Sequence, residues 1–304
     1  MNFNEKYKEI KNLAQDEIKL IEENMVSQIE IREPLNFSLK KFLLAPAKRI
    51  RPVLAILYIK ALEETLNKKQ IDHLTVIEMV HNASLIHDDI IDESKIRRGN
   101  ETINTNFDNK LAVISGDYIL SLAMEKLSEI GNIELIKDFS QTIRQMCIGE
   151  INQNFDRFKI STLEDYIEKT KNKTAYLFEI ALTGCAKLSD TKYDIKSISK
   201  LGLNIGIAFQ IRDDLINITK SDSLKPTNND FEHGIYTAPI ILGDKSDNYA
   251  SGIEKTKILF VIKAKLTETT QDMRLLNVIS WDKNFTRTVY EIKFTRVVAI
   301  PKII

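Results

Sequence analysis

Residues 81–99 read HNASLIHDDIIDESKIRRG, and this stretch decides both the fold class and the chemistry that we expect. The residues that lead into it, from Leu74 onward, are mostly apolar and include neither Gly nor Pro, which predicts a helix. A helix turns by about 100° per residue, so His81, Asp88 and Asp92 fall on one stripe of its surface. The sequence therefore predicts two carboxylates one turn apart on one face of a helix.

These two carboxylates repel each other, and on a buried face both would need a positively charged partner. A divalent cation is a natural partner, because Mg²⁺ is typically held by one or two carboxylates and takes its other ligands from water and substrate phosphates. The alternative is an exposed acidic surface, which is what runs of charge in a helix usually are. This stretch alone leaves both interpretations open.

A second acidic cluster favours metal binding. Residues 202–218 read GLNIGIAFQIRDDLINI, which again predicts a helix, with Gln210, Asp213 and Asn217 on one stripe. Two acidic clusters, each on an otherwise apolar helix, predict two walls that face one cavity. Cations between these walls could hold a diphosphate.

Five motifs resemble those of the trans-polyprenyl (isoprenyl) diphosphate synthase family, in the family's order. They are AKRIRP (Ala47–Pro52), HDDIID (His87–Asp92), RRG (Arg97–Gly99), KT (Lys173–Thr174) and FQIRDD (Phe209–Asp214). Five ordered motifs make the resemblance highly specific. It implies an all-α fold, an isoprenoid-synthase-type bundle of many helices around a central cavity. The low content of Gly (10) and Pro (6) also favours long helices.

The resemblance further implies a site for two diphosphates and Mg²⁺. The residues that match the family's metal ligands are Asp88, Asp92 and Asp213. The other residues that match its allylic diphosphate site are Arg97, Lys173, Thr174, Gln210 and Lys225. Isopentenyl diphosphate would bind Lys48, Arg51, His81 and Arg98. The residues expected to act in catalysis are Asp88, Asp92, Arg97, Lys173 and Asp213.

The implied enzyme is a prenyltransferase that condenses isopentenyl diphosphate head-to-tail with an allylic prenyl diphosphate. Metal ions and fixed cations would stabilise the charge on the departing diphosphate, and a held alkene would make bond formation effectively unimolecular. A long all-trans product is expected, because Ala83 and Ser84 are small where short-chain relatives carry bulky aromatic residues as a floor.

Two other functions remain open on the sequence. One is a subunit of a heteromeric polyprenyl synthase that is inactive without its partner. The other is a terpene cyclase, which also uses an Asp-rich helix with Mg²⁺. A cyclase needs only one diphosphate pocket, however, so the cluster of Lys48, Arg51 and Arg98 would be unexplained.

Three features depart from the family's pattern. Ala47 stands where the family usually has Gly, which costs some stability if this position needs a positive φ. Asn217 replaces the usual Asp, and its uncharged amide predicts weaker metal affinity. The family ends in helices, whereas residues 257–304 contain β-branched, strand-like runs. We therefore expect a helical polyprenyl synthase domain over residues 1–256 and a divergent segment over 257–304, either natural or produced by a frameshift.

The composition limits the other classes of function. The 304 residues include 43 basic and 43 acidic ones, so no net charge attracts nucleic acid or anionic lipid. Cys147 and Cys185 lie in apolar helical patterns, which favours two buried thiols in a reducing cytosol. Neither a signal peptide nor a membrane-spanning run is evident in the sequence. We expect a cytoplasmic protein, and the family resemblance implies a homodimer.

Overall fold

The computed structural model describes residues 3–62, 65–219, 234–243, 253, 255 and 256. The chain folds into two compact units. Of the described residues, those within 1–10, 141–179 and 196–256 form unit 1, and those within 11–140 and 180–195 form unit 2. The segment expected to diverge, residues 257–304, lies outside the described residues.

Helix α5 (Lys68–Ile91) organises unit 2, where it packs against α2, α4, α6 and α7. A capping box fixes its start: the Asn67 side chain accepts from the Gln70 backbone N–H, and the Gln70 side chain accepts from the Asn67 backbone N–H. Every residue from Gln70 to Val80 is buried, on all sides of the helix, as is typical of an interior helix.

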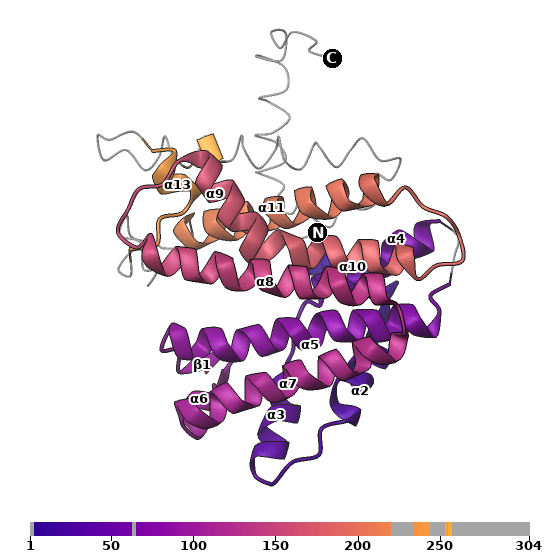
Figure 1. Ribbon diagram of the computed structural model, residues 1–304. Coiled ribbons are helices and arrows are strands. Elements are labelled where there is room, and N and C mark those ends of the chain that lie inside the picture. Colours follow the sequence, from indigo (N-terminus) through magenta and orange to yellow (C-terminus); the bar gives the residue numbers. More distant parts are fainter. Residues whose placement is uncertain (1–2, 63–64, 220–233, 244–252, 254, 257–304) are drawn as a thin grey trace, which may run out of the picture. The chain divides into compact units, whose positions relative to one another are not determined.

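The other elements of unit 2 surround this helix, and Figure 1 shows α7 running beside α5. They are α2 (Gln15–Ser27), α3 (Leu35–Leu43), α4 (Ile50–Ala61), β1 (Ile96–Arg97), β2 (Asn100–Glu101), α6 (Ile103–Asn106) and α7 (Asn109–Ile130). Because α5 is covered along its buried part, its polar side chains are accessible only towards its two ends, and the first acidic motif lies at the C-terminal one.

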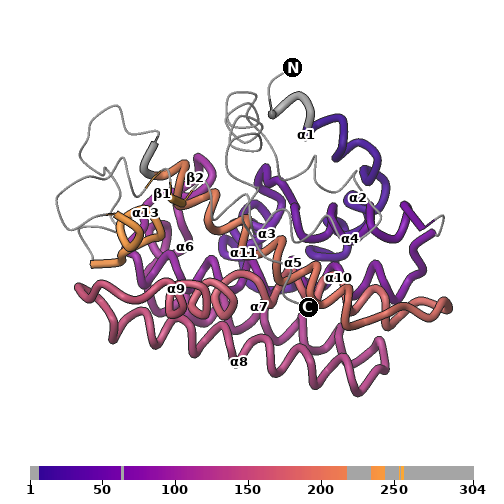
Figure 2. The backbone as a smooth tube through the Cα atoms, turned by 90° about the horizontal axis from the view of Figure 1, so that it is seen from above, coloured from indigo at the N-terminus to yellow at the C-terminus, as the bar shows by residue number. Residues whose placement is uncertain are grey.

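Unit 1 is built mainly from helices of the second half of the chain. They are α1 (Phe3–Asn12), α9 (Leu163–Thr170), the π-helical turn η1 (Lys171–Ala175), α11 (Ile195–Thr219) and α13 (Ala238–Ile241). Helices α8 (Ile133–Phe155) and α10 (Tyr176–Lys187) are each divided between the units, with at least one turn in each. Helix α13 lies beside α9 (Figure 2).

Two glycines allow other helices to approach η1 closely. A Cβ atom on Gly206 of α11 would lie 2.5 Å from Cα of Ala175, and one on Gly149 of α8 would lie 3.0 Å from Cβ of Asn172. Any larger residue at position 206 would therefore push α11 away from the π-helical turn. This packing matters for function because η1 carries two of the expected site residues.

The structure confirms the expected all-α class, since the only strands in the described ranges are the two-residue β1 and β2. The expectation of two buried thiols is wrong for one of them. Cys185 is buried, which raises the pKa of its thiol, but Cys147 is exposed. Cys147 lies on a stripe of α8 with Arg144 and Ile151 that is exposed in this chain, although the apolar pattern suggested a core position.

Candidate functional site

The first acidic motif lies at the C-terminal end of α5, in unit 2. The helix ends at Ile91, and the backbone N–H of Asp92 caps it by donating to the Asp88 backbone oxygen over 2.8 Å. The Asp92 side chain is exposed and that of Asp88 is half-buried. A helix C-terminus also carries a partial negative charge. The two carboxylates and the helix end together favour a bound cation.

Asp89, within the same motif, has a different environment. Its side chain is buried, and one carboxylate oxygen accepts a 2.6 Å hydrogen bond from Nε of Arg97. Burial raises the pKa of the Asp89 carboxyl, and the Arg97 guanidinium opposes this shift. Asp89 therefore holds Arg97 beside the motif.

The donors at this helix end fit Mg²⁺. Within the part of the chain that the structure describes, no three side chains of His, Cys, Asp or Glu gather into a ready-made metal site. Mg²⁺ does not need such a cage, because it binds through one or two carboxylates and takes substrate phosphates and waters as its other ligands. Asp88 and Asp92 supply that number of carboxylates.

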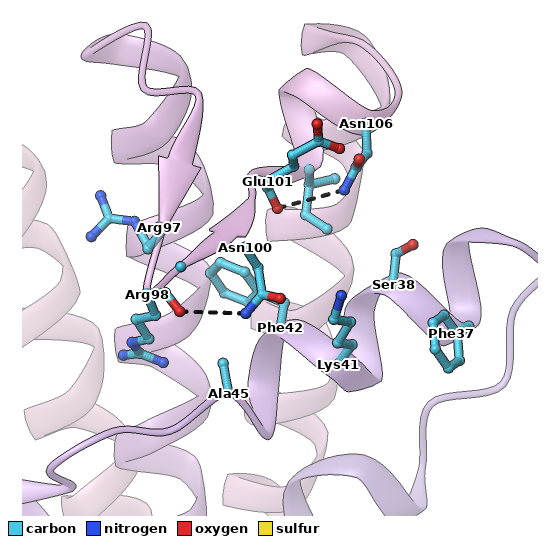
Figure 3. A pocket seen from close by; sticks show the side chains of 12 residues that line it. Phe37, Ser38, Lys41, Phe42, Ala45, Arg97, Arg98, Asn100, Glu101 and Asn106 are labelled. Carbon is cyan, nitrogen blue, oxygen red and sulfur yellow. Dashed lines mark hydrogen bonds between the residues drawn. The ribbon is translucent and has the colours of Figure 1, made fainter.

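A tight hairpin presents two arginines beside the motif. Strands β1 and β2 pair antiparallel, and the turn between them consists of Arg98 and Gly99, with φ values of 51° and 77°. Two positive φ values are what a type I′ turn requires, which suits Gly99 but strains Arg98. In Figure 3 the guanidinium groups of Arg97 and Arg98 point away from Lys41. The hairpin and α3 also line a cavity of about 340 Å³.

The Arg98 guanidinium turns towards α5, where one of its nitrogens lies 3.4 Å from Oδ1 of Asn82. It is close to His81, whose pKa is lowered well below its usual value by burial and then by the charges of Arg51 and Arg98. The His81 ring is therefore neutral at pH 7, with one N–H donor. Unit 2 thus brings together three of the four residues expected to bind isopentenyl diphosphate.

The fourth, Lys48, lies on the loop before α4, and its side chain is exposed. The basic cluster on this loop is not uniformly exposed, because Arg49 is buried. Ala47 does not adopt the positive φ that would have made it costly: the residue of this loop with a positive φ, 54°, is Arg49. The Ala47 backbone oxygen instead accepts a 3.0 Å hydrogen bond from Nζ of Lys11.

The second acidic motif lies on α11, in unit 1, and its two carboxylates differ. Asp213 is partly exposed, with Oδ1 3.3 Å from a guanidinium nitrogen of Arg212. Asp214 is buried, and it accepts hydrogen bonds from the Tyr166 hydroxyl (2.7 Å) and from Nε2 of Gln210 (2.9 Å). Burial raises the pKa of Asp214 to about 6. Asp213 is therefore the more accessible oxygen donor of the pair.

Gln210 connects Asp214 to η1. Because an ionised carboxylate only accepts, the amide nitrogen of Gln210 faces Asp214, and its oxygen accepts a 2.8 Å hydrogen bond from the Thr174 hydroxyl. Next to Thr174, Nζ of Lys173 lies 2.7 Å from a carboxylate oxygen of Glu150. π-helical turns within helices are frequent at functional sites. Unit 1 thus brings Lys173, Thr174 and Gln210 together.

Two other residues singled out in the sequence, Lys225 and Asn217, have not yet been located. Lys225 lies outside the described residues. Asn217 is exposed near the end of α11. Three supporting residues were not expected from the sequence: Tyr166, and the buried pair in which Arg49 donates to Glu78 over 3.0 Å. Glu78 carried a signal, because it is a lone carboxylate within an apolar helical run, whereas nothing in the sequence distinguished Tyr166.

Comparisons with known proteins give the family. The Polyprenyl synthetase family model matches residues 32–276. A prenyl transferase of Cyanidium caldarium is 33% identical over 275 residues, which are 88% of this chain and 82% of that protein. The chain belongs to the polyprenyl synthetase family. This confirms the resemblance seen in the motifs, and with it a prenyltransferase enzyme.

Two further relatives of this polyprenyl synthetase carry more specific names. Solanesyl diphosphate synthase 2 of Arabidopsis thaliana, a chloroplastic protein, is 35% identical over 236 residues, 74% of this chain and 57% of that one. Component 2 of the heptaprenyl diphosphate synthase of Bacillus subtilis is 33% identical over 247 residues, 79% of this chain and 70% of that one.

A solved structure supports the fold of this polyprenyl synthetase. The crystal structure of a decaprenyl diphosphate synthase from Rhodobacter capsulatus matches 94% of this chain and 99% of that one, with a TM-score of 0.79 and 22% identity. The expected isoprenoid-synthase-type helical fold is thereby confirmed. Among the helices that the structure describes, none is both long and apolar enough to cross a membrane.

Proposed function

We propose that the protein condenses isopentenyl diphosphate head-to-tail with an allylic prenyl diphosphate to give a long-chain all-trans polyprenyl diphosphate. The family supplies the prenyltransferase class, and relatives named for solanesyl and heptaprenyl diphosphate support a long product. The two acidic motifs account for one diphosphate. The separate cluster of Arg51, His81 and Arg98 is the observation that supports a second diphosphate, and so a reaction between two substrates. A terpene cyclase, with one diphosphate to bind, has no use for this cluster.

We assign the allylic diphosphate to the two acidic motifs. Mg²⁺ would be held by Asp88, Asp92 and Asp213, and when bound it would neutralise charge on the leaving diphosphate. Arg97 adds a cation whose position is fixed by Asp89, so little reorganisation is needed as that charge develops. The further residues of this subsite are Lys173, Thr174, Gln210 and Lys225.

Isopentenyl diphosphate is assigned to Lys48, Arg51, His81 and Arg98. The two arginines can each offer paired N–H groups to a phosphate. The neutral ring of His81 can donate one hydrogen bond to the same anion without adding a charge that burial would penalise. Holding the second substrate in this way would keep its alkene beside the allylic carbon, which removes the entropic cost of a bimolecular encounter.

We infer that the product length is set by the residues about one turn before Asp88 on α5. Ala83 is buried, and the Ser84 hydroxyl donates to the His81 backbone oxygen over 2.8 Å, so neither position carries a bulky side chain that could block a growing prenyl chain. Substituting Ser84→Phe should therefore shorten the product chains, as measured by chromatography of the hydrolysed prenyl alcohols. An unchanged product length in this variant would show that the floor lies elsewhere.

We also propose a homodimer. Two helices each carry a pair of exposed apolar side chains one turn apart, Leu111 and Ile114 on α7 and Ile151 and Phe155 on α8. A second copy of the chain could cover such a pair. A heteromeric enzyme is the second candidate, because one relative is named as component 2 of a synthase. The cytoplasmic location stays a prediction from the sequence.

The deciding experiment incubates the purified protein with Mg²⁺, radiolabelled isopentenyl diphosphate and farnesyl diphosphate, and sizes the labelled products. A ladder that ends at one long prenyl diphosphate is expected. Activity that appears only on addition of a second subunit would replace the homodimer with a heteromer. Consumption of farnesyl diphosphate without incorporation of label would contradict the proposal and favour a cyclase.

A further inference from the structure

Arg49 lies between two residues that we assign to isopentenyl diphosphate, but its own side chain is fully buried. Its Nε donates to Glu22 of α2 over 3.0 Å, and one terminal nitrogen donates to Glu78 of α5 over 3.0 Å. The other terminal nitrogen donates to the backbone oxygen of Leu43, at the end of α3. The guanidinium therefore joins three helices and has no free face for a substrate.

The backbone at this position is strained. Arg49 has φ 54° and ψ 40°, the left-handed conformation, and it is the residue from which α4 starts. A residue with a Cβ atom adopts this conformation at a cost in free energy, and it persists only where the surroundings enforce it. The three hydrogen bonds of the side chain supply that enforcement. They set the direction in which the chain leaves Lys48 and enters the first turn of α4, where Arg51 lies.

The ion pair between Arg49 and Glu78 also affects the net charge beside the substrate. Glu78 is buried, and its negative charge raises the pKa of Arg98 against the larger lowering effect of burial. A buried carboxylate with no cation on it, next to a diphosphate site, would repel the substrate. Its ion pair with Arg49 neutralises this charge before any substrate arrives.

We propose that Arg49 is a positioning residue for isopentenyl diphosphate: it fixes the loop that carries Lys48 and Arg51 and neutralises Glu78 beneath it. This inference rests on the proposed function, because it needs Lys48 and Arg51 to bind that substrate. It does not involve the allylic diphosphate, whose assigned residues in unit 2 are the acidic motif and Arg97. Loss of Arg49 should therefore weaken the binding of isopentenyl diphosphate and leave the binding of the allylic diphosphate unchanged.

The test measures binding by calorimetry, with isopentenyl diphosphate alone and with farnesyl diphosphate plus Mg²⁺. Arg49→Met leaves Glu78 buried without its partner, so this variant is expected to be less stable. The double variant Arg49→Met, Glu78→Gln removes both charges, which should restore much of the thermal stability. It should still bind isopentenyl diphosphate about tenfold more weakly than wild type, because the loop is no longer preorganised.

A matched control is Lys126→Met, which breaks another largely buried ion pair of unit 2, between Lys126 and Asp72. Asp72 lies more than two turns before His81 on α5, so this pair is distant from the isopentenyl diphosphate residues. It should lower the melting temperature without changing either affinity. Wild-type affinity for isopentenyl diphosphate in the double variant, or an equal loss for farnesyl diphosphate, would overturn the role of Arg49. The role of Arg49 is tested by binding affinities, whereas the proposed function is tested by turnover of the wild-type protein. Failure of one can therefore be told from failure of the other.

Discussion

At the scale of single residues, the hydroxyl of Tyr166 is expected to affect turnover, although Tyr166 is not assigned to bind a substrate or a metal ion. Tyr166 donates to Asp214, which fixes Gln210, which in turn accepts from Thr174. Tyr166→Phe removes one donor from a buried carboxylate and should lower the free energy of unfolding by about 1–3 kcal/mol. It should also lower kcat with the allylic substrate roughly tenfold, because Gln210 and Thr174 lose their fixed orientation. Steady-state kinetics and chemical denaturation measure the two effects.

A double-mutant cycle separates this path from a general loss of stability. If the hydroxyl acts through Thr174, adding Tyr166→Phe to Thr174→Val should cost little further activity. Multiplied losses in the double variant would argue for independent roles. Tyr176→Phe is a matched control, because it removes the hydroxyl of a half-buried tyrosine just after η1 and should leave kcat unchanged.

Candidate residues for the site could be proposed from the sequence, but the side chains that hold them in place could not. The motifs predict Asp88, Asp92 and Asp213 as oxygen donors. Asp88 and Asp213 lie on the helices that the apolar periodicity predicted, and Asp92 caps the end of α5. Arg49 shows the limit: in the sequence it is one of three basic residues in a turn, and only the packing of α2 and α5 distinguishes it from its neighbours. Burial of a charge depends on contacts distant in the chain, which periodicity does not encode.

At the scale of elements, the close approach of α11 to η1 predicts the effect of one added methyl group. In Gly206→Ala the new Cβ would lie 2.5 Å from Cα of Ala175, a backbone atom that cannot turn aside. The two elements must separate, which should lower the free energy of unfolding by about 1–3 kcal/mol. The displaced turn carries Lys173 and Thr174, so the KM for the allylic diphosphate should rise as well.

Gly131→Ala is the control for this prediction. Gly131 also has a constraint, a φ of 72° at the end of α7, but a Cβ there meets nothing closer than 4.0 Å. Its substitution should cost roughly 1 kcal/mol of stability through backbone strain alone and should leave KM unchanged. An equal change of KM in both variants would mean that stability, and not the position of η1, controls substrate binding.

Long helices could be predicted from the sequence, whereas the short elements that shape the site could not. Helix α5 follows from an apolar run without Gly or Pro, and α11 follows from an apolar helical pattern despite Gly202 and Gly206. The hairpin at Arg98–Gly99 and the π-helical turn at Lys171–Ala175 have too few residues for any periodicity. Their conformations are fixed by tertiary contacts, such as the bond between Arg97 and Asp89 and the close packing of Gly206.

At the scale of the whole molecule, the core of unit 2 contains a histidine that should make folding depend on pH. His73 is completely buried on α5, with its ring edge against Phe139, and its Nε2–H donates to the Ile180 backbone oxygen over 3.0 Å. Its Nδ1 atom is buried and has no hydrogen-bond partner. A second proton would therefore place an unpaired charge in the core, and burial lowers the pKa of His73 to about 4.

The direction of the pH effect follows from comparing the two states. The unfolded chain binds a proton at His73 near the ordinary pKa of about 6.5, whereas the folded chain binds it only near 4. Above pH 6.5 neither state is protonated there, so this residue adds no pH dependence. Between pH 6.5 and 4 the unfolded state binds more protons, so the free energy of unfolding should fall, by about 3 kcal/mol in total from this residue.

His73→Phe isolates this contribution, since it keeps a ring of similar shape and removes the titrating nitrogen. At pH 7 the variant should be less stable by about 1–3 kcal/mol, because the Ile180 carbonyl loses its donor. Its stability should depend less on pH between 6.5 and 4, so the two proteins should approach each other in acid. Denaturant unfolding at several pH values measures both slopes. Parallel slopes would show that His73 has the same pKa in the folded and unfolded states, which would require water or a carboxylate to reach a ring that the structure places in the core.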